Sequence, residues 1–213
     1  MAKIELKNVA HSYSPDVENP EYALKKCNLS WKDGGRYAVL GPSGCGKTTM
    51  LNIMSGLVTP SEGTIKFDGV DITNMSTAER NIAQVFQFPV IYNTMTVAQN
   101  LGFPLLCRNY PKEVITKKVD QVAQTLGLEN LLNLRATKLT ADQKQLISLG
   151  RGLVREDVAA ILMDEPLTVI DPDLKFRLRR RLKEINELYK STLIYVTHDQ
   201  NEAMTFAENI LVM

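Results

Sequence analysis

The hydrophobic pattern of the chain predicts several β-strands. Residues 1–6 alternate between apolar and polar positions, which is typical of a strand with one exposed face. Residues 36–40, 158–163 and 192–197 are nearly continuous apolar runs, as in strands of a parallel sheet that are buried on both faces. Residues 208–213 indicate a further strand, in which the chain stops, and the polar stretch 14–21 indicates a surface loop.

Two segments have the spacing of amphipathic helices. Thr140 and Gln143 form a capping-box pattern before one helix, and Asp142 in its first turn suits the helix dipole. The apolar positions of this helix are Leu146, Ile147, Leu149 and Leu153. A second helix has an apolar stripe made by Leu174, Leu178, Leu182, Ile185 and Leu188, and its basic residues Lys175, Arg177, Arg179, Arg180, Arg181 and Lys183 predict a solvated face. Strands and helices together predict an α/β fold.

A glycine-rich segment follows the run at 36–40 and matches the phosphate-loop pattern G-x-x-x-x-G-K-[ST] at every fixed position. Glycines let the backbone amides curl around phosphates, and the next helix points its N-terminus at them. Lys47 would pair with the β- and γ-phosphates of a nucleoside triphosphate, and Thr48 would bind Mg²⁺. The alternative is an ordinary glycine-rich turn. The predicted phosphate loop comprises Gly41, Pro42, Ser43, Gly44, Cys45, Gly46, Lys47, Thr48 and Thr49.

Polar residues follow two of the predicted buried strands. Asp164 and Glu165 come after the run at 158–163, and His198 comes after the run at 192–197. Ligands of open α/β sheets bind at the carboxyl ends of the strands. Asp164 is therefore predicted to reach Mg²⁺, Glu165 to orient or deprotonate the attacking water, and His198 to contact the γ-phosphate. The alternatives are a solvated turn for the two carboxylates and a cap or surface position for the histidine.

Composition narrows the class of protein. The 213 residues suit one domain, and a net charge of +1 gives no electrostatic footprint for nucleic acid. Three scattered cysteines favour a reducing compartment, with the cytoplasm as the default. No stretch approaches the roughly 18 apolar residues of a membrane span, so we expect any membrane association to run through a partner.

These motifs, in this order along nearly the whole chain, resemble the nucleotide-binding subunit of an ATP-binding cassette (ABC) transporter. The resemblance implies a P-loop NTPase (RecA-like) core at 1–83 and 154–213, with an antiparallel β subdomain, and a helical subdomain at 84–153. It also implies that Tyr13 stacks on adenine, that Gln87 links Mg²⁺ to the transporter contact region, that Asp171 lies in a dimer-interface loop (167–171), and that His198 is the switch histidine. For Tyr13 and Gln87 the alternatives are an ordinary strand aromatic and an ordinary loop residue.

The chain departs from the resembled family at the signature, usually Leu-Ser-Gly-Gly-Gln. Here the signature segment is Leu139, Thr140, Ala141, Asp142 and Gln143, so both glycines are absent. In the family this helix N-terminus presses on the γ-phosphate held by the partner subunit. Two unit charges 4 Å apart repel by about 4 kcal/mol at an effective dielectric of 20. Although Thr140 keeps a hydroxyl donor, we expect the composite site completed by this segment to hydrolyse ATP slowly or to be regulatory.

The resemblance also implies partners. Because the chain's own phosphate loop, Asp164, Glu165 and His198 fit the family pattern, a second, non-identical ATPase subunit is expected, with a homodimer as the alternative. Segments 86–97 and 100–105 resemble the surface with which the family contacts two transmembrane permease subunits. We expect about half of the apolar residues in these segments to lie in the core instead. The sequence of these segments resembles that of the carbohydrate-uptake branch, and within it the glycerol and polyol importers. This resemblance implies that the chain lies at the cytoplasmic face of the inner membrane. An extracytoplasmic solute-binding protein is then an indirect partner.

Two other functions are weighed against the importer. A soluble cassette ATPase that acts on ribosomes or DNA would carry two cassettes or long coiled coils, and the sequence has neither. A non-hydrolysing regulatory subunit would be favoured by loss of Lys47 or Glu165, and both are present. Importers of this branch usually continue into a β-rich regulatory domain, which the 213 residues do not include, so we expect either a fragment or a natural short form.

Overall fold

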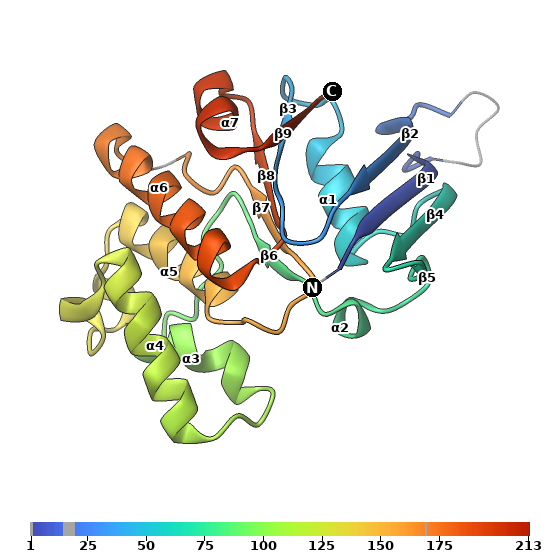
Figure 1. Cartoon of the computed structure of the whole chain (residues 1–213). Helices are drawn as coiled ribbons and strands as arrows, with labels where there is room; N and C mark the ends of the chain where they lie inside the picture. The colour runs from blue at the N-terminus through green and yellow to red at the C-terminus, as the bar shows by residue number, and fades with distance from the viewer. Residues whose placement is uncertain (1, 15–19, 169) are drawn as a thin grey trace. The chain divides into compact units, whose positions relative to one another are not determined.

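The computed structural model describes residues 2–14, 20–168 and 170–213, and contacts within the chain divide it into two compact units (Figure 1). The first unit comprises Met1–Gln84, Asp157–Asp164 and Lys183–Met213; the second comprises Val85–Glu156 and Glu165–Leu182. Residues 165–182 thus cluster with the second unit, whereas the sequence analysis assigns them to the core. Most of the expected loop at 14–21 lies outside the described residues.

The first unit contains an antiparallel sheet in the order β2 (Leu24–Trp31), β1 (Ile4–His11), β4 (Glu62–Phe67) and β5 (Val70–Asp71). Strand β1 pairs with both β2 and β4, so Ile4 lies opposite Trp31 on one side and Phe67 on the other. The strand predicted at residues 1–6 is present, but it begins at Ile4 and runs on to His11.

The parallel sheet of this unit carries the predicted buried strands. Its order is β6 (Ala83–Val85), β7 (Ile161–Asp164), β8 (Leu193–Thr197), β3 (Arg36–Leu40) and β9 (Asn209–Val212), with β7, β8, β3 and β9 running parallel. The strand expected at 158–163 begins at Ile161 and ends with Asp164 inside the strand; just before it, the carbonyl oxygen of Ala160 accepts a hydrogen bond from the backbone N–H of Ala83. Strand β6 is not predicted by the sequence analysis and includes the expected start of the helical subdomain at Gln84.

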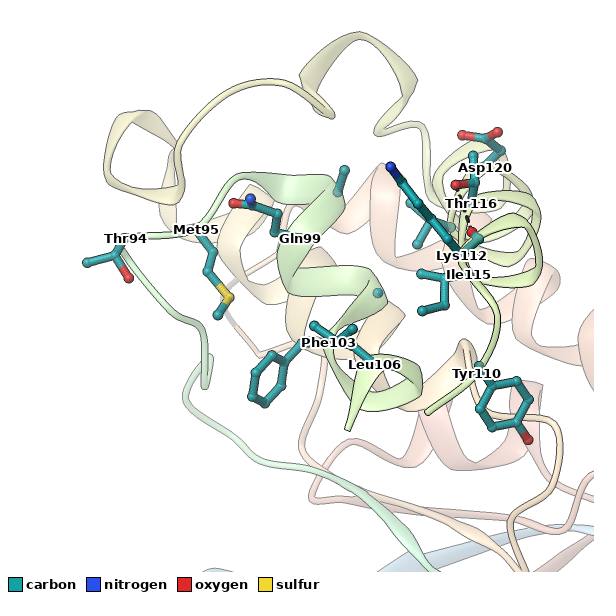
Figure 2. A pocket seen from close by; sticks show the side chains of 13 residues that line it. Thr94, Met95, Gln99, Phe103, Leu106, Tyr110, Lys112, Ile115, Thr116 and Asp120 are labelled. Atoms are coloured by element: carbon teal, nitrogen blue, oxygen red, sulfur yellow. Dashed lines mark hydrogen bonds between the residues drawn. The ribbon is translucent and has the colours of Figure 1, made fainter. Parts of the chain in front are cut away.

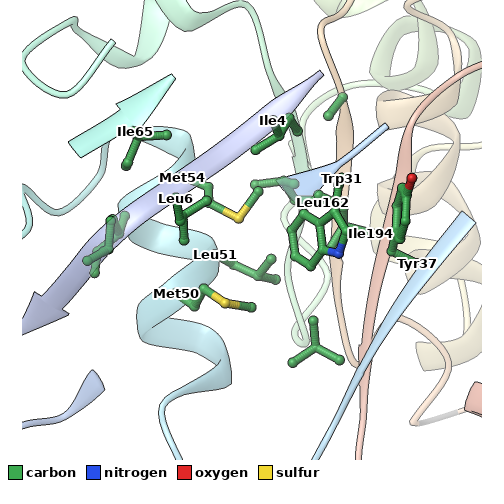
Figure 3. Close-up of a cluster of buried hydrophobic side chains, with 14 of the residues drawn as sticks. Ile4, Leu6, Trp31, Tyr37, Met50, Leu51, Met54, Ile65, Leu162 and Ile194 are labelled. Carbon is green, nitrogen blue, oxygen red and sulfur yellow. The ribbon is translucent and has the colours of Figure 1, made fainter. Parts of the chain in front are cut away.

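The core of the first unit lies around helix α1 (Lys47–Ser55). Figure 3 shows Met50, Leu51 and Met54 of this helix among side chains from both sheets. Trp31 and Tyr37 stack beside them with ring centroids 5.4 Å apart. Because α1 begins at the last positions of the phosphate loop, this apolar packing fixes the direction in which the loop points.

Arg80, at the end of helix α2 (Thr77–Arg80), closes the other end of α1. Its buried guanidinium donates hydrogen bonds to the carbonyl oxygens of Ile53, Met54, Met75 and Thr73, at 2.6, 3.1, 3.0 and 2.7 Å. These include carbonyls that the last turn of a helix leaves without partners. Burial lowers the pKa of Arg80 from its usual value. The sequence analysis gives no role to this residue.

The second unit is helical. Helices α3 (Val97–Leu106), α4 (Lys112–Leu126) and α5 (Ala141–Leu153) pack on one another, with the 3₁₀ turns η1 (Glu129–Leu131) and η2 (Ala136–Lys138) between α4 and α5 (Figure 1). Their shared core includes Leu101, Leu126 and Leu149. The predicted helix with Thr140 as its N-cap and a capping box to Gln143 is present as α5.

Helix α6 (Pro172–Tyr189) is divided between the two units after Leu182. Leu178 and Leu182 are buried as predicted, but Leu188 is 72% exposed, so the predicted apolar stripe ends before the last turn. Helix α7 (Gln200–Phe206) completes the first unit. Among the described residues, no helix is both long and apolar enough to cross a membrane.

Candidate functional site

The predicted phosphate loop joins β3 to α1 in the first unit. Gly46 is the N-cap of α1 and has a φ of 100°, a conformation that residues with a side chain rarely adopt. A Cβ at Gly46 would lie 2.4 Å from the carbonyl oxygen of Ala23, and a Cβ at Gly41 would lie 2.7 Å from Cys45 Sγ. Backbone outside the loop, at Ala23 for Gly46 and at Met213 for Gly41 (2.8 Å), thus leaves no room for a side chain at either position. The loop leads directly into a helix N-terminus, where backbone amides favour anions.

Lys47 lies inside this loop and is only 5% exposed. Its Nζ donates hydrogen bonds to the carbonyl oxygens of Gly41 at 2.9 Å and Pro42 at 2.7 Å, and it lies 3.8 Å from Cys45 Sγ. The ammonium group therefore ties the start of the loop to its end. A cation held at this position next to backbone amides gives the loop the charge that a triphosphate requires.

Thr48 and Asp164 meet although they lie far apart in the sequence. Thr48 Oγ1 donates a hydrogen bond of 2.8 Å to Asp164 Oδ2, and Asp164 is buried at the carboxyl end of β7. A hydroxyl and a carboxylate are hard oxygen donors, and Mg²⁺ in nucleotide sites is usually held by one or two such groups together with phosphate oxygens and water. The pair fits the predicted magnesium ligands.

Tyr13 exposes most of its ring near the end of the loop. Its side chain is 62% exposed, its hydroxyl lies 3.4 Å from Thr49 Oγ1, and its ring meets the ring of His11 edge to face with centroids 4.6 Å apart. The contact with His11 fixes the ring orientation and leaves area accessible for stacking. The geometry suits the expected role toward adenine, which stays a prediction.

His198 follows β8 in the first unit, and a buried network holds the residues beside it. Glu202 Oε2 accepts hydrogen bonds from Tyr195 Oη at 3.0 Å and Thr197 Oγ1 at 2.9 Å, and Thr197 Oγ1 accepts one from the backbone N–H of Asp199 at 3.1 Å. The imidazole is exposed. The sequence analysis misses Glu202, although an acidic residue four positions after the histidine, in the first turn of a helix, is visible in the sequence.

Gln87 and Glu165 approach each other in the second unit. Gln87 Nε2 donates to Glu165 Oε2 at 3.5 Å, and Thr168 Oγ1 donates to the carbonyl oxygen of Glu165 at 3.0 Å. Glu165 has a φ of 45°, which places a residue with a side chain in the left-handed region. Glu165 is predicted to act on the attacking water and Gln87 to link Mg²⁺ to the transporter contact region, and the fold brings their side chains together.

The signature segment begins α5. Thr140 is the N-cap, its Oγ1 accepts from the backbone N–H of Gln143 at 3.4 Å, and the Gln143 side chain accepts from the backbone N–H of Thr140 at 3.1 Å. The Thr140 hydroxyl also donates to Asp142 Oδ1. The hydroxyl donor that the sequence analysis leaves for a phosphate is thus already bonded within the segment. Leu139 is buried before the helix, and Ala141 is its first residue.

Asp171, the residue expected in the dimer-interface loop, lies before α6. Its Oδ1 accepts from the backbone N–H groups of Asp173 at 3.0 Å and Leu174 at 3.4 Å, as a capping aspartate does. Val169 of the same loop lies outside the described residues. The geometry gives Asp171 a structural role in the chain itself.

The family of proteins described as ABC transporter matches residues 24–168. The chain belongs to this family. The matched range includes the phosphate loop, the signature segment and both carboxylates, which are the parts on which the resemblance depends.

Several curated relatives align with all 213 residues of this ABC cassette. The sn-glycerol-3-phosphate import ATP-binding protein UgpC 1 of Rhizobium etli is 40% identical and that of Brucella abortus 39% identical. The trehalose import ATP-binding protein SugC of Mycobacterium tuberculosis is 40% identical. The chain covers 60%, 59% and 53% of the lengths of these three relatives, respectively.

Solved structures agree with the cassette fold. A dimeric ATP-binding cassette in a post-hydrolysis state, bound to ADP and Pi, superposes with a TM-score of 0.88 at 31% identity, covering 99% of this chain and 94% of that one. A second cassette in its ADP conformation gives a TM-score of 0.84 at 25% identity, covering 100% of this chain and 87% of that one. The predicted ABC-type α/β fold is confirmed. None of these comparisons supports the expectation of two unlike ATPase subunits.

The cassette also has an apolar groove in its second unit (Figure 2). Its volume is about 760 Å³, and Figure 2 shows Phe103 and Leu106 of α3 and Ile115 of α4 among its walls. The full lining is Thr94, Met95, Ala98, Gln99, Gly102, Phe103, Leu106, Tyr110, Lys112, Ile115, Thr116, Val119 and Asp120. The expected contact segments 86–97 and 100–105 supply only part of this lining; helix α4 supplies much of the rest.

Side chains of those contact segments divide between surface and core. Phe88 and Val90 are exposed, whereas Val97, Leu101 and Leu105 are buried. About half of these apolar residues are expected in the core from the sequence, but fewer are buried, because Tyr92 is also exposed and the others are only partly buried: Phe86, Ile91, Met95 and Phe103. The second unit thus carries exposed apolar side chains at Phe88 and Val90 as well as the groove.

Proposed function

We propose that this chain is the ATP-binding and ATP-hydrolysing subunit of a membrane ABC importer. The observation that carries the proposal is the phosphate loop, in which buried Lys47 bonds the loop carbonyls while Thr48 lies 2.8 Å from Asp164. Groups from two distant parts of the sequence are thereby brought together, which supports a site for a nucleotide with a divalent cation. The names of the relatives, which are import ATP-binding proteins, favour an importer.

Each residue has a part in phosphoryl transfer. Lys47 and the loop amides bind the β- and γ-phosphates, and the ring of Tyr13 stacks on the adenine. Thr48 and Asp164 hold Mg²⁺, which when bound neutralises charge on the phosphate oxygens. Glu165 orients the attacking water, and Gln87 holds the Glu165 carboxylate in place.

His198 provides the remaining contact to the γ-phosphate. The hydrogen bonds between Glu202 and Thr197 and between Thr197 and Asp199 fix the backbone on both sides of His198, so the position of the Cα atom that carries the exposed imidazole is fixed as well. A ring donor aimed at the terminal phosphate stabilises the charge that develops there during transfer.

The transported solute is a small polar molecule of the glycerol, polyol or sugar class. This part of the proposal rests on the relatives, which import sn-glycerol-3-phosphate and trehalose. As an importer subunit, the chain would lie at the cytoplasmic face of the membrane, where two permease subunits hold it. An extracytoplasmic solute-binding protein would act through these permease subunits. Nothing favours the alternative of a ribosome- or DNA-acting ATPase.

We propose that the groove between α3 and α4 is the binding site for a short helix of a permease subunit. Its lining is largely apolar, with Lys112 and Asp120 at α4 as charged members, which suits one face of an amphipathic helix. Exposed Phe88 and Val90 extend the same kind of surface in the second unit.

The composite site with a second cassette is proposed to be asymmetric. The signature segment bears Asp142 and has its hydroxyl donor bonded internally, so it is poorly suited to meet a phosphate held by a partner. A second, non-identical cassette with signature glycines would complete this chain's own phosphate loop. In a homodimer, both composite sites would instead contain the altered segment.

Replacing Glu165 with Gln tests the hydrolytic assignment. The amide keeps the shape of the side chain but cannot act as a base, so we expect ATP affinity within about threefold of the original and turnover lower by about a hundredfold or more. The measurement is steady-state phosphate release together with binding of a fluorescent ATP analogue.

Glu129→Gln, at an exposed carboxylate of η1, is the matched control and should leave both values unchanged. If turnover of Glu165→Gln equals that of the original chain, the role given to Glu165 is wrong.

A further inference from the structure

Gln145 is a completely buried polar side chain that the proposed chemistry does not use. It lies on α5, two residues after the signature segment, and is 0% exposed. Its Nε2 donates to the carbonyl oxygen of Phe86 at 3.2 Å and to that of Pro166 at 2.9 Å. Its Oε1 is buried and has no hydrogen-bond partner among the described residues.

The orientation of this amide is set by its neighbours. Two carbonyl oxygens can be approached only by the NH₂ end, because a flipped amide would direct its own oxygen at them. Leaving the other end without a donor is costly, since buried polar atoms are normally bonded. The hydrogen bonds that Gln145 makes are therefore those of its two N–H groups.

The two acceptors belong to the segments that carry the Gln87–Glu165 pair. The carbonyl of Phe86 forms the peptide bond to Gln87, and Pro166 directly follows Glu165. Because each peptide unit is planar, a hydrogen bond to its carbonyl fixes the orientation of that whole unit. Gln145 therefore fixes the peptide unit that leads into Gln87 and the Pro166–Leu167 unit that begins one residue after Glu165, on the two sides of a side-chain contact that is itself 3.5 Å long.

We infer that Gln145 is the positioning residue that couples α5 to the hydrolytic pair, setting the geometry of Gln87 and Glu165 without touching ATP. Helix α5, which begins with the signature segment, then also holds the segments that contain Gln87 and Glu165. A shift of α5 changes the orientation of the Glu165 carboxylate. This inference rests on the proposed function, in which Glu165 orients the attacking water.

Gln145→Met tests the inference, because Met has nearly the same length and volume but no donor. We expect kcat to fall by about ten- to a hundredfold, since small displacements of a catalytic group have effects of this size, with KM for ATP changed less than twofold. Gln84→Met is the matched control: Gln84 also has a buried, unpartnered Oε1, but its Nε2 bonds Asn52 in the first unit. Its kcat should equal that of the original chain.

Coupling to Glu165 separates positioning from general structural support. In the Glu165→Gln background, Gln145→Met should change the residual rate by less than twofold, because there is no carboxylate left to position. Full additivity of the two effects would overturn the inference, as would a kcat for Gln145→Met within twofold of the original.

A second readout does not depend on ATP hydrolysis. Hydrogen exchange of peptides containing 86–88 and 166–168 should become faster in Gln145→Met and stay unchanged in Gln84→Met. If the chain hydrolyses no ATP either alone or together with a cassette that carries the signature glycines, the proposed function fails, whereas unchanged exchange at both segments contradicts the coupling by Gln145. If Gln145→Met does not fold, Gln145→Asn, with the amide one methylene shorter, should show the same faster exchange and an intermediate kcat; values equal to the original would overturn the inference.

Discussion

The phosphate loop and the signature segment are both turns that lead into a helix N-terminus, but only the signature segment caps that terminus with its own side chains. Helix α1 has Gly46 as its N-cap, with no side-chain cap and no acidic residue in its first turn. Helix α5 has Thr140 as its N-cap, a capping box with Gln143, and Asp142 in its first turn. The first-turn amides of α1 are accessible to an external anion, whereas α5 caps its own N-terminus with side chains of the same segment.

The difference separates a terminus that binds a ligand from one that is stabilised for folding. A capping box and a first-turn carboxylate stabilise a helix by about 1 kcal/mol each. The same groups occupy backbone donors and introduce negative charge, both of which oppose phosphate binding. Stability of α5 and contact with a partner's ATP therefore conflict in this chain, and we attribute the expected weak composite site to that conflict.

Gly46→Ala should give the largest effect on the phosphate loop. The new Cβ would lie 2.4 Å from the Ala23 carbonyl oxygen at a φ of 100°, so the loop must shift. We expect the free energy of unfolding to fall by about 3 kcal/mol and ATP binding to be lost. Urea denaturation and binding of a fluorescent ATP analogue measure the two effects.

Gly44→Ala is the matched control for this prediction. Gly44 also has a positive φ, 82°, but nothing lies within 4 Å of the position that the new methyl group would take, so only the backbone conformation is penalised. We expect a loss of about 1 kcal/mol. Equal losses at the two glycines would contradict the close approach at Gly46.

Thr140→Val should give a smaller effect, confined to stability. Loss of the cap is expected to reduce the free energy of unfolding by about 1 kcal/mol. Turnover should change less than twofold, because the hydroxyl bonds Asp142 within the segment and this neighbouring carboxylate opposes a phosphate there.

Thr96→Val is the control for Thr140→Val, because Thr96 and Gln99 form the same capping box at α3. Its loss of stability in thermal or urea unfolding should be similar. A much larger fall in turnover for Thr140→Val than for Thr96→Val would mean that Thr140 does contact nucleotide.

The sequence predicts these two turns well because their information is local. The phosphate-loop pattern and the Thr140–Gln143 box depend on residues within one or two helical turns, and both are found where predicted. The strands at 36–40 and 192–197 are also found almost to the residue, since continuous apolar runs are typical of buried parallel strands.

Contacts between residues that are far apart in the sequence cannot be predicted from such local patterns. Arg80 and Gln145 bond carbonyl groups far away in the sequence, and neither lies in a local pattern that signals it. The groove is only partly predicted for the same reason: the expected segments supply one wall, and α4, for which the sequence predicts no role, supplies the other.

The most direct test of the central claim mixes two forms of the chain. One is the original protein; the other carries Glu165→Gln, which removes its own hydrolysis, together with Ala141→Gly and Asp142→Gly, which restore the signature glycines. If the signature limits a partner's site, the equimolar mixture should hydrolyse ATP several times faster than the original chain alone, because the intact Glu165 then faces a restored signature. A rate no higher than the mean of the two separate proteins would contradict the claim.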